Sequence, residues 1–204
     1  MRIMRTLRRW RGWHDERAAQ MVEFAVSLPL LVVFVVGIFD FSGAFTLKQK
    51  MTNVVRDAAR VAAADPASDV TASGAAPASV IDAYQLIANY FNANNINLCG
   101  VTVGSLANSG VATWKASGSG GGCPGSGLTI TINRGYYFAE STGDSAPTDC
   151  TTAQALGSNV AEIGTCVSIQ YAYAWRFGKV SSLLGPTVSL PSTINAVSVA
   201  MNEN

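Results

Sequence analysis

Residues 24–39 read FAVSLPLLVVFVVGIF, a run of sixteen residues without a charged side chain. A membrane-spanning helix needs roughly 20 residues that are mostly apolar, and the segment DFSGAFTL over 40–47 supplies the missing length. On the other side the apolar character reaches back to Ala18, with Glu23 as the only charge. The run therefore predicts one membrane-spanning helix.

A basic leader precedes this run and predicts its orientation. Residues 1–17 contain six arginines and only two acids. Basic residues beside a span stay on the cytoplasmic side of the membrane, so we expect a cytoplasmic N-terminus and everything after about residue 45 outside. Trp10 and Trp13 stand among these arginines, as interfacial anchors often do. The residues that carry the topology signal are Arg2, Arg5, Arg8, Arg9, Arg11 and Arg17.

The helical pattern continues beyond the apolar run. Apolar residues recur at spacings of 4, 3, 4 and 3 over 47–61, which is one face of an α-helix. Asp65-Pro66 then ends the helix, because proline disfavours helix in the residue before it. A cleaved signal peptide is the alternative, with small residues at Ser42-Gly43-Ala44, but the pattern runs through that point. The members of the face are Leu47, Met51, Val54, Ala58 and Val61.

Composition and cysteines indicate an exported domain. Charged residues make up 13% of the chain, against roughly 25% in soluble domains, and the net charge of +1 suggests no nucleic-acid partner. All four cysteines follow the span, which predicts two disulfides in an oxidising compartment. Three pairings are possible; Cys99–Cys123 with Cys150–Cys166 is favoured because each closes a local loop. Buried free thiols and a zinc site are alternatives. Against zinc, the sequence has no C-x-x-C pair, and its only histidine is His14 in the leader.

The region after the linker 65–77 begins with a second helix. Pro77 or Ser79 can start it, with Asp82 placed as in a capping box, and residues 92–97 end it. An apolar face recurs at spacings of 4, 3 and 4. Its members are Val80, Tyr84, Ile87 and Phe91.

Strand patterns dominate the rest of the chain. Alternation predicts strands at 101–103, 128–132, 167–175 and 194–201, a surface loop at 118–127 and a helical turn at 180–184. The predicted fold is α+β: a long N-terminal transmembrane helix, a second amphipathic helix and an antiparallel β-sheet. The expected division is a leader over 1–18, the long helix over 19–64, a linker over 65–77 and a periplasmic domain over 78–204.

Motifs of catalysis are missing from the sequence. It has no phosphate-binding glycine loop with lysine and no H-E-x-x-H, so we expect no enzyme activity, cofactor, metal or small-molecule substrate. Asp144 and Asp149 read as residues of a solvated loop. Four tyrosines read as sheet and core residues, with an adhesive face as the lesser alternative. They are Tyr136, Tyr137, Tyr171 and Tyr173.

Glu23 carries the most specific signal, because a carboxylate in a membrane helix costs on the order of 3 kcal/mol and by default suggests a function. It stands in RAAQMVEF over 17–24, before the apolar core, GIFDF over 37–41 and NVVRDAARVAA over 53–63. In this order the segments resemble the TadE-like family of tight-adherence (Flp) pilus systems, within the prepilin-like proteins of the type IV class. The motif at its centre is Val22, Glu23 and Phe24.

The resemblance implies a minor pseudopilin that is processed in the bacterial inner membrane. In prepilin-like proteins a membrane aspartyl peptidase cuts five residues before the glutamate, here between Ala18 and Ala19. The family usually has glycine where this chain has Ala18. The new α-amine of Ala19 would be neutralised by Glu23 when subunits pack. A simple acid at the helix start, favourable to the helix dipole, is the alternative role of Glu23.

The implied partners are other pilins and pseudopilins, Tad assembly-platform proteins, the prepilin peptidase and membrane lipid. The exported domain would be periplasmic, or extracellular within a pilus. Two rival functions remain open. One is an uncleaved single-pass anchor carrying a periplasmic binding module that never enters a filament, and the other is a soluble hydrolase released by cleavage near Ala44.

Overall fold

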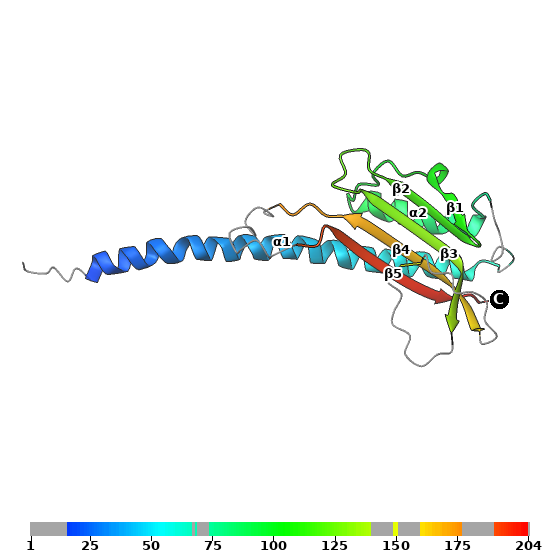
Figure 1. Cartoon of the computed structure of the whole chain (residues 1–204), viewed down its shortest axis with the longest axis horizontal. Coiled ribbons are helices and arrows are strands. Elements are labelled where there is room, and N and C mark those ends of the chain that lie inside the picture. The colour runs from blue at the N-terminus through cyan, green and yellow to red at the C-terminus, as the bar shows by residue number, and fades with distance from the viewer. Residues whose placement is uncertain are drawn as a thin grey trace, which may run out of the picture. The chain divides into compact units, whose positions relative to one another are not determined.

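The computed structural model describes residues 16–66, 68, 74–139, 149–150, 160–176 and 190–203 (Figure 1). It is α+β, with a long apolar helix, a second helix and an antiparallel sheet of five strands, as the sequence predicts. The chain forms two compact units, Met1–Phe39 and Asp40–Asn204. The elements are α1 (Glu16–Ala64), α2 (Ala78–Ala93), the 3₁₀ helix η2 (Val103–Ser105), β1 (Ala107–Gly110), β2 (Thr113–Gly118), β3 (Leu128–Ala139), β4 (Val160–Ala172) and β5 (Thr193–Met201).

Helix α1 runs through Pro29 without interruption and ends at Ala64, next to Asp65-Pro66. Within the second unit one face of α1 is buried in the core. The predicted face was wrong at Val61, which is 38% exposed. Ala59 and Ala62 are fully buried at this end of the helix instead. Alanines in this face allow the helix backbone to approach the sheet closely. The fully buried residues of the face are Met51, Val54, Val55, Ala58, Ala59 and Ala62.

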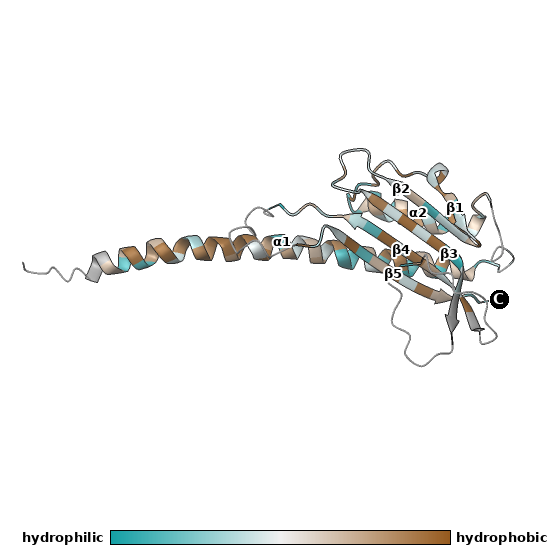
Figure 2. Ribbon diagram, in the orientation of Figure 1, coloured by the Kyte–Doolittle hydropathy of each residue, from teal (hydrophilic) through white to brown (hydrophobic). Residues whose placement is uncertain are grey.

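The sheet has the strand order β1-β2-β3-β4-β5, and every neighbouring pair is antiparallel. Side chains alternate between its two faces, because successive strand residues point to opposite sides. On the inner face Ile130 pairs with Ile169, and on the outer face Thr131 pairs with Ser168. Figure 2 shows the resulting brown and pale bands along β3 and β4. The inner row of cross-strand partners is Ala116, Ile130, Ile169 and Ala196.

Helix α2 closes the core with the face predicted from its spacing, and Val80, Ile87 and Phe91 are fully buried. The Tyr84 hydroxyl donates a 2.8 Å hydrogen bond to the Val101 carbonyl oxygen, which ties α2 to the segment before η2. The predicted capping box with Asp82 was wrong. The helix starts one residue before Ser79, with Pro77 as the N-cap and no side-chain capping hydrogen bond.

Two stretches differ from the predicted strands. Residues 101–103 form no strand, because local hydrogen bonds satisfy this backbone: Ser105 N–H donates to Thr102 O at the start of η2. At the other end β4 stops at Ala172, so 173–175 lies beyond the strand. Strands β1 and β2 were not predicted; β1 reads ANSG and is exposed at every position, so it shows no apolar alternation. The predicted turn at 180–184 lies outside the described residues.

Two disulfides brace the sheet, Cys99–Cys123 and Cys150–Cys166, which is the pairing that the sequence favours. The first holds the glycine-rich loop after β2 to the segment after α2. The second fastens residue 150 to β4 on the outer face, where the Asn133 amide donates a 3.1 Å hydrogen bond to the Cys150 carbonyl oxygen. Bridges that close loops of this size stabilise a fold by roughly 3 kcal/mol in the chain-entropy account.

Candidate functional site

The first half of α1 exposes large apolar side chains around its whole circumference. Met21 is 75% exposed, Phe24 and Phe34 are each 64% exposed, and Phe39 is 70% exposed. Among the described residues, one helix is long and apolar enough to cross a membrane, and it is the Ala19–Ala64 part of α1. Figure 2 shows this half as a nearly continuous brown ribbon. A helix that is apolar on every side belongs in a protein core or a membrane, so α1 is compatible with a single-pass membrane anchor.

The predicted processing and assembly residues lie at the start of this helix. Ala18, Ala19 and Glu23 are all within α1, and Ala19 and Glu23 are exposed. Residues four apart share one face of a helix, so the Glu23 carboxylate lies one turn along from the backbone nitrogen of Ala19. In the part of the chain that the structure describes, Glu23 has no hydrogen bond or ion pair. Val22 and Phe24, the other motif residues, are also exposed.

The leader is mostly outside the described residues. Arg2, Arg5, Arg8, Arg9 and Arg11 precede the first described position, as does His14. Arg17 lies within α1, and only its backbone is described. The topology signal of these arginines therefore remains a prediction from the sequence.

Asp40, an acid of α1 just after the apolar run, is only 6% exposed. Its carboxylate accepts a 3.1 Å hydrogen bond from the backbone N–H of Arg176, and its carbonyl oxygen accepts one of 3.4 Å from the Tyr173 hydroxyl. A Cβ added at Gly43 would lie 2.9 Å from the Tyr173 hydroxyl oxygen, so glycine makes this approach possible. Burial raises the pKa of Tyr173, as does the Asp40 charge, while Arg176 lowers it.

The other end of α1 is held by Arg134 of β3, whose side chain is fully buried. Its guanidinium donates to the carbonyl oxygens of Ala62, Asp65 (3.1 Å) and Pro66 (3.2 Å). The last carbonyls of a helix have no partner within the helix and carry partial negative charge, so a buried cation here caps α1. The guanidinium also donates to the side-chain oxygens of Thr165 (2.8 Å) and Asn202 (3.3 Å).

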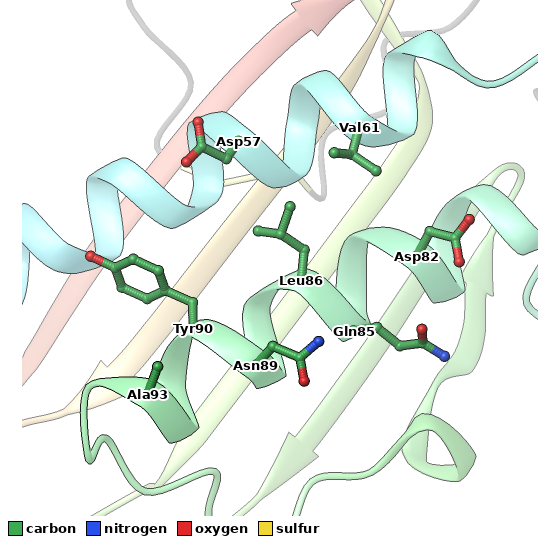
Figure 3. Close-up of a pocket in the computed structure, with 8 residues that line it drawn as sticks. All are labelled: Asp57, Val61, Asp82, Gln85, Leu86, Asn89, Tyr90 and Ala93. Atoms are coloured by element: carbon green, nitrogen blue, oxygen red, sulfur yellow. The ribbon is translucent and has the colours of Figure 1, made fainter.

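A groove of about 600 Å³ lies between α1 and α2 in the second unit (Figure 3). Val61 and Leu86 give it an apolar part, and the exposed carboxylates of Asp57 and Asp82 stand on different helices beside it. No group of three or more metal-ligating side chains occurs among the described residues. The remaining lining residues are Gln85, Asn89, Tyr90 and Ala93.

The other predicted candidates are scattered. Tyr171 is buried in the core beside Phe91, with ring centroids 6.4 Å apart, whereas Tyr173 lies against α1. Tyr136 is half-buried, the side chain of Tyr137 is not described, and Asp144 lies outside the described residues, whereas Asp149 is half-buried. Sequence reasoning missed Arg134, Trp175 and Arg176. For Trp175 and Arg176 the available signal was the segment YAYAWRF over 171–177, in which aromatic residues and an arginine stand together at the end of a predicted strand.

These observations define an α+β protein with an apolar N-terminal helix that is compatible with a membrane anchor. The family model described as TadE-like protein matches residues 18–60. The chain is therefore similar to the TadE-like family over this segment, where the sequence resemblance had been recognised. No curated protein and no solved structure matches the chain.

Proposed function

We propose that this protein is a minor pseudopilin that takes part in the assembly, priming or tip formation of a Tad/Flp-type pilus. The observation that carries the proposal is the first half of α1, an exposed apolar helix with one exposed carboxylate inside the segment that matches the TadE-like model. In this proposal α1 is anchored in the inner membrane with its N-terminus in the cytoplasm, and the α+β domain lies in the periplasm.

Removal of the leader creates the charge with which the Glu23 carboxylate pairs. Cleavage between Ala18 and Ala19 creates an α-amine that is positively charged near neutral pH. A buried charge without a partner is strongly destabilising, whereas a paired one is tolerated. When apolar helices pack together, Glu23 pairs with the amine of its own or a neighbouring subunit, and neither charge is left alone. The exposure of Glu23 supports this role, as does its lack of a hydrogen bond or ion pair among the described residues.

Processing tests the first step. Mass spectrometry of the protein purified from membranes with its prepilin peptidase present should find Ala19 as the first residue. Deletion of the peptidase should restore Met1. A product that starts at Met1 under both conditions would support the uncleaved membrane-anchored binding module instead, and a soluble product that starts near Ala44 would contradict both.

Charge pairing is tested by Glu23→Gln, which keeps size and polarity but removes the charge. We expect membrane insertion to be normal and co-purification with the major pilin to be lost. Asp57→Asn is the matched control, because Asp57 is an exposed acid on the same helix beyond the apolar run, and it should leave co-purification intact. Normal co-purification of the Glu23→Gln protein would contradict the proposed pairing.

A further inference from the structure

Three aromatic rings gather where the apolar run of α1 ends. The rings of Phe41 and Trp175 meet edge to face with centroids 5.2 Å apart, and those of Tyr173 and Trp175 do so at 5.1 Å. The Trp175 indole N–H donates a 2.8 Å hydrogen bond to the Pro191 carbonyl oxygen. These three residues, here called the aromatic cluster, are thus fixed by contacts with one another and with the backbone.

The aromatic cluster is incompletely covered by protein. Phe41 is 60% exposed, and Phe45, one turn further along α1, is 64% exposed. Tyr173 and Trp175 are half-buried, and Arg176 is exposed. The surface therefore combines apolar rings, two polar ring groups and a cation, which is the composition that a membrane–water interface favours.

The position of the cluster along α1 agrees with that interface. The hydrocarbon core of a bilayer is about 30 Å thick, which a helix crosses in about 20 residues. Counted back along α1 from Asp40, such a span starts near Met21, close to the Ala19 end of the candidate span. Asp40, Phe41 and Phe45 then lie at the outer edge of the hydrocarbon.

A carboxylate at this depth needs polar partners, since charge in hydrocarbon is costly. The backbone N–H of Arg176 donates to the Asp40 carboxylate, and the Tyr173 hydroxyl donates to the Asp40 carbonyl oxygen, so the 173–176 segment and the helix edge form one surface.

We propose that the aromatic cluster and Arg176 form a lipid-docking surface that binds phospholipid headgroups at the outer bilayer interface. Trp175 and Tyr173 lie at the level of the lipid carbonyls, Arg176 pairs with lipid phosphate, and the surface fixes the depth of α1 in the membrane. The inference rests on the proposed membrane insertion of α1 and is independent of pilus assembly.

Depth-resolved fluorescence quenching tests the docking surface. The full-length protein carries Trp10→Phe and Trp13→Phe, which leaves Trp175 and the fully buried Trp114 of β2 as emitters. It is reconstituted in phosphatidylcholine vesicles whose acyl chains are brominated near the headgroup or near the bilayer centre. We expect quenching by the shallow bromines, weaker quenching by the deep ones, and loss of the quenching when Trp175→Phe is added.

Two glycine variants test whether the position of the aromatic cluster determines the quenching of Trp175. Gly43→Ala crowds the Tyr173 hydroxyl, so it should displace the aromatic cluster and reduce the shallow quenching of Trp175. Gly37→Ala is the matched control on the same helix, because a Cβ there meets no atom within 4 Å, and it should leave quenching unchanged. Circular dichroism shows whether each variant is folded.

Vesicle flotation distinguishes failure of the inference from failure of the proposed function. Protein that floats with vesicles but whose Trp175 is not quenched by shallow bromines would overturn the docking surface and leave the membrane anchor standing. Equal quenching at both depths would overturn it too. Protein that does not float would overturn both.

Discussion

The two halves of α1 differ in what they pack against: the second half packs against the sheet of its own chain, whereas the first half is exposed. From Met21 to Phe39 the helix is rich in Phe, Leu and Val on every side, and most of these side chains are exposed. From Met51 to Ala62 it places Ala and Val on one face against its own sheet and keeps Arg56, Asp57 and Arg60 exposed. One continuous helix therefore contains a segment whose burial is completed within the chain and another whose burial requires lipid or other helices.

The largest test of this difference compares two phenylalanines. Phe91→Ala removes a fully buried ring of the core and should lower the free energy of unfolding of the α+β unit by about 4 kcal/mol. Phe34→Ala removes a ring that is 64% exposed in the first half of α1 and should change it by less than about 0.5 kcal/mol. Chemical denaturation of the full-length protein in detergent, followed by tryptophan fluorescence, measures both. Comparable losses would mean that the two halves share one core.

The capping role of Arg134 predicts the next effect. Arg134→Met keeps an apolar stem but leaves the carbonyl oxygens at the end of α1 buried without this donor, at a cost of about 3 kcal/mol. Arg60→Met, an exposed arginine on α1, is the control and should change stability by less than about 0.5 kcal/mol. The same denaturation experiment applies. An Arg134→Met protein as stable as the control would show that the cap contributes nothing.

Two valines on α1 give a smaller and more local comparison. Val54 is fully buried, whereas Val61 is 38% exposed beside the groove. Val54→Ala should cost about 2 kcal/mol by loss of buried methyl groups, and Val61→Ala well under half as much. Thermal melting followed by circular dichroism would rank them. The reverse order would mean that Val61, and not Val54, packs in the core.

The smallest effect concerns the buried phenol of Tyr84. Burial raises its pKa above the ordinary value of 10.0, so the folded protein holds this proton more tightly than the unfolded chain. The contribution is present below pH 10 and is lost as pH rises through the folded pKa. Tyr84→Phe should cost about 1 kcal/mol at neutral pH by loss of the hydrogen bond to Val101, and should flatten the alkaline decline.

Stability measured between pH 7 and 11 checks the Tyr84 prediction. Tyr90→Phe, on the same helix, controls at neutral pH for the loss of any hydroxyl from α2. An alkaline decline that is unchanged in the Tyr84→Phe protein would assign it to other groups, among them Tyr171 and Tyr173, whose pKa values are also raised by burial.

Much of this architecture could be predicted from local patterns. The end of α1 at Asp65-Pro66, the buried face of α2 and the strands at 128–132 and 194–201 follow from periodicity and proline, which act within a few residues. Strand β1 could not be predicted, because its ANSG sequence is held by backbone pairing with β2. Such pairing depends on a neighbour that only the folded sheet supplies.

The candidate sites divide in the same way. The motif around Glu23 is contiguous, so it could be recognised from the sequence. Asp40 instead contacts Tyr173 and Arg176, which follow it in the chain by 133 and 136 positions. Arg134 likewise reads as an ordinary polar residue after an alternating strand. Its role depends on α1, β4 and residue 202 converging, and no local pattern encodes that convergence.

The Arg134 contacts also determine how a mechanical force on α1 is passed to the sheet. A pull on α1 along its axis arrives at the helix end, where the guanidinium joins the last carbonyls to β3, to Thr165 of β4 and to Asn202 just after β5. Residues of β3, of β4 and of the segment just after β5 therefore resist the force together. For a subunit tethered by its helix, tension would be shared among β3, β4 and the end of β5, which are neighbours in the sheet, before any single strand is peeled away.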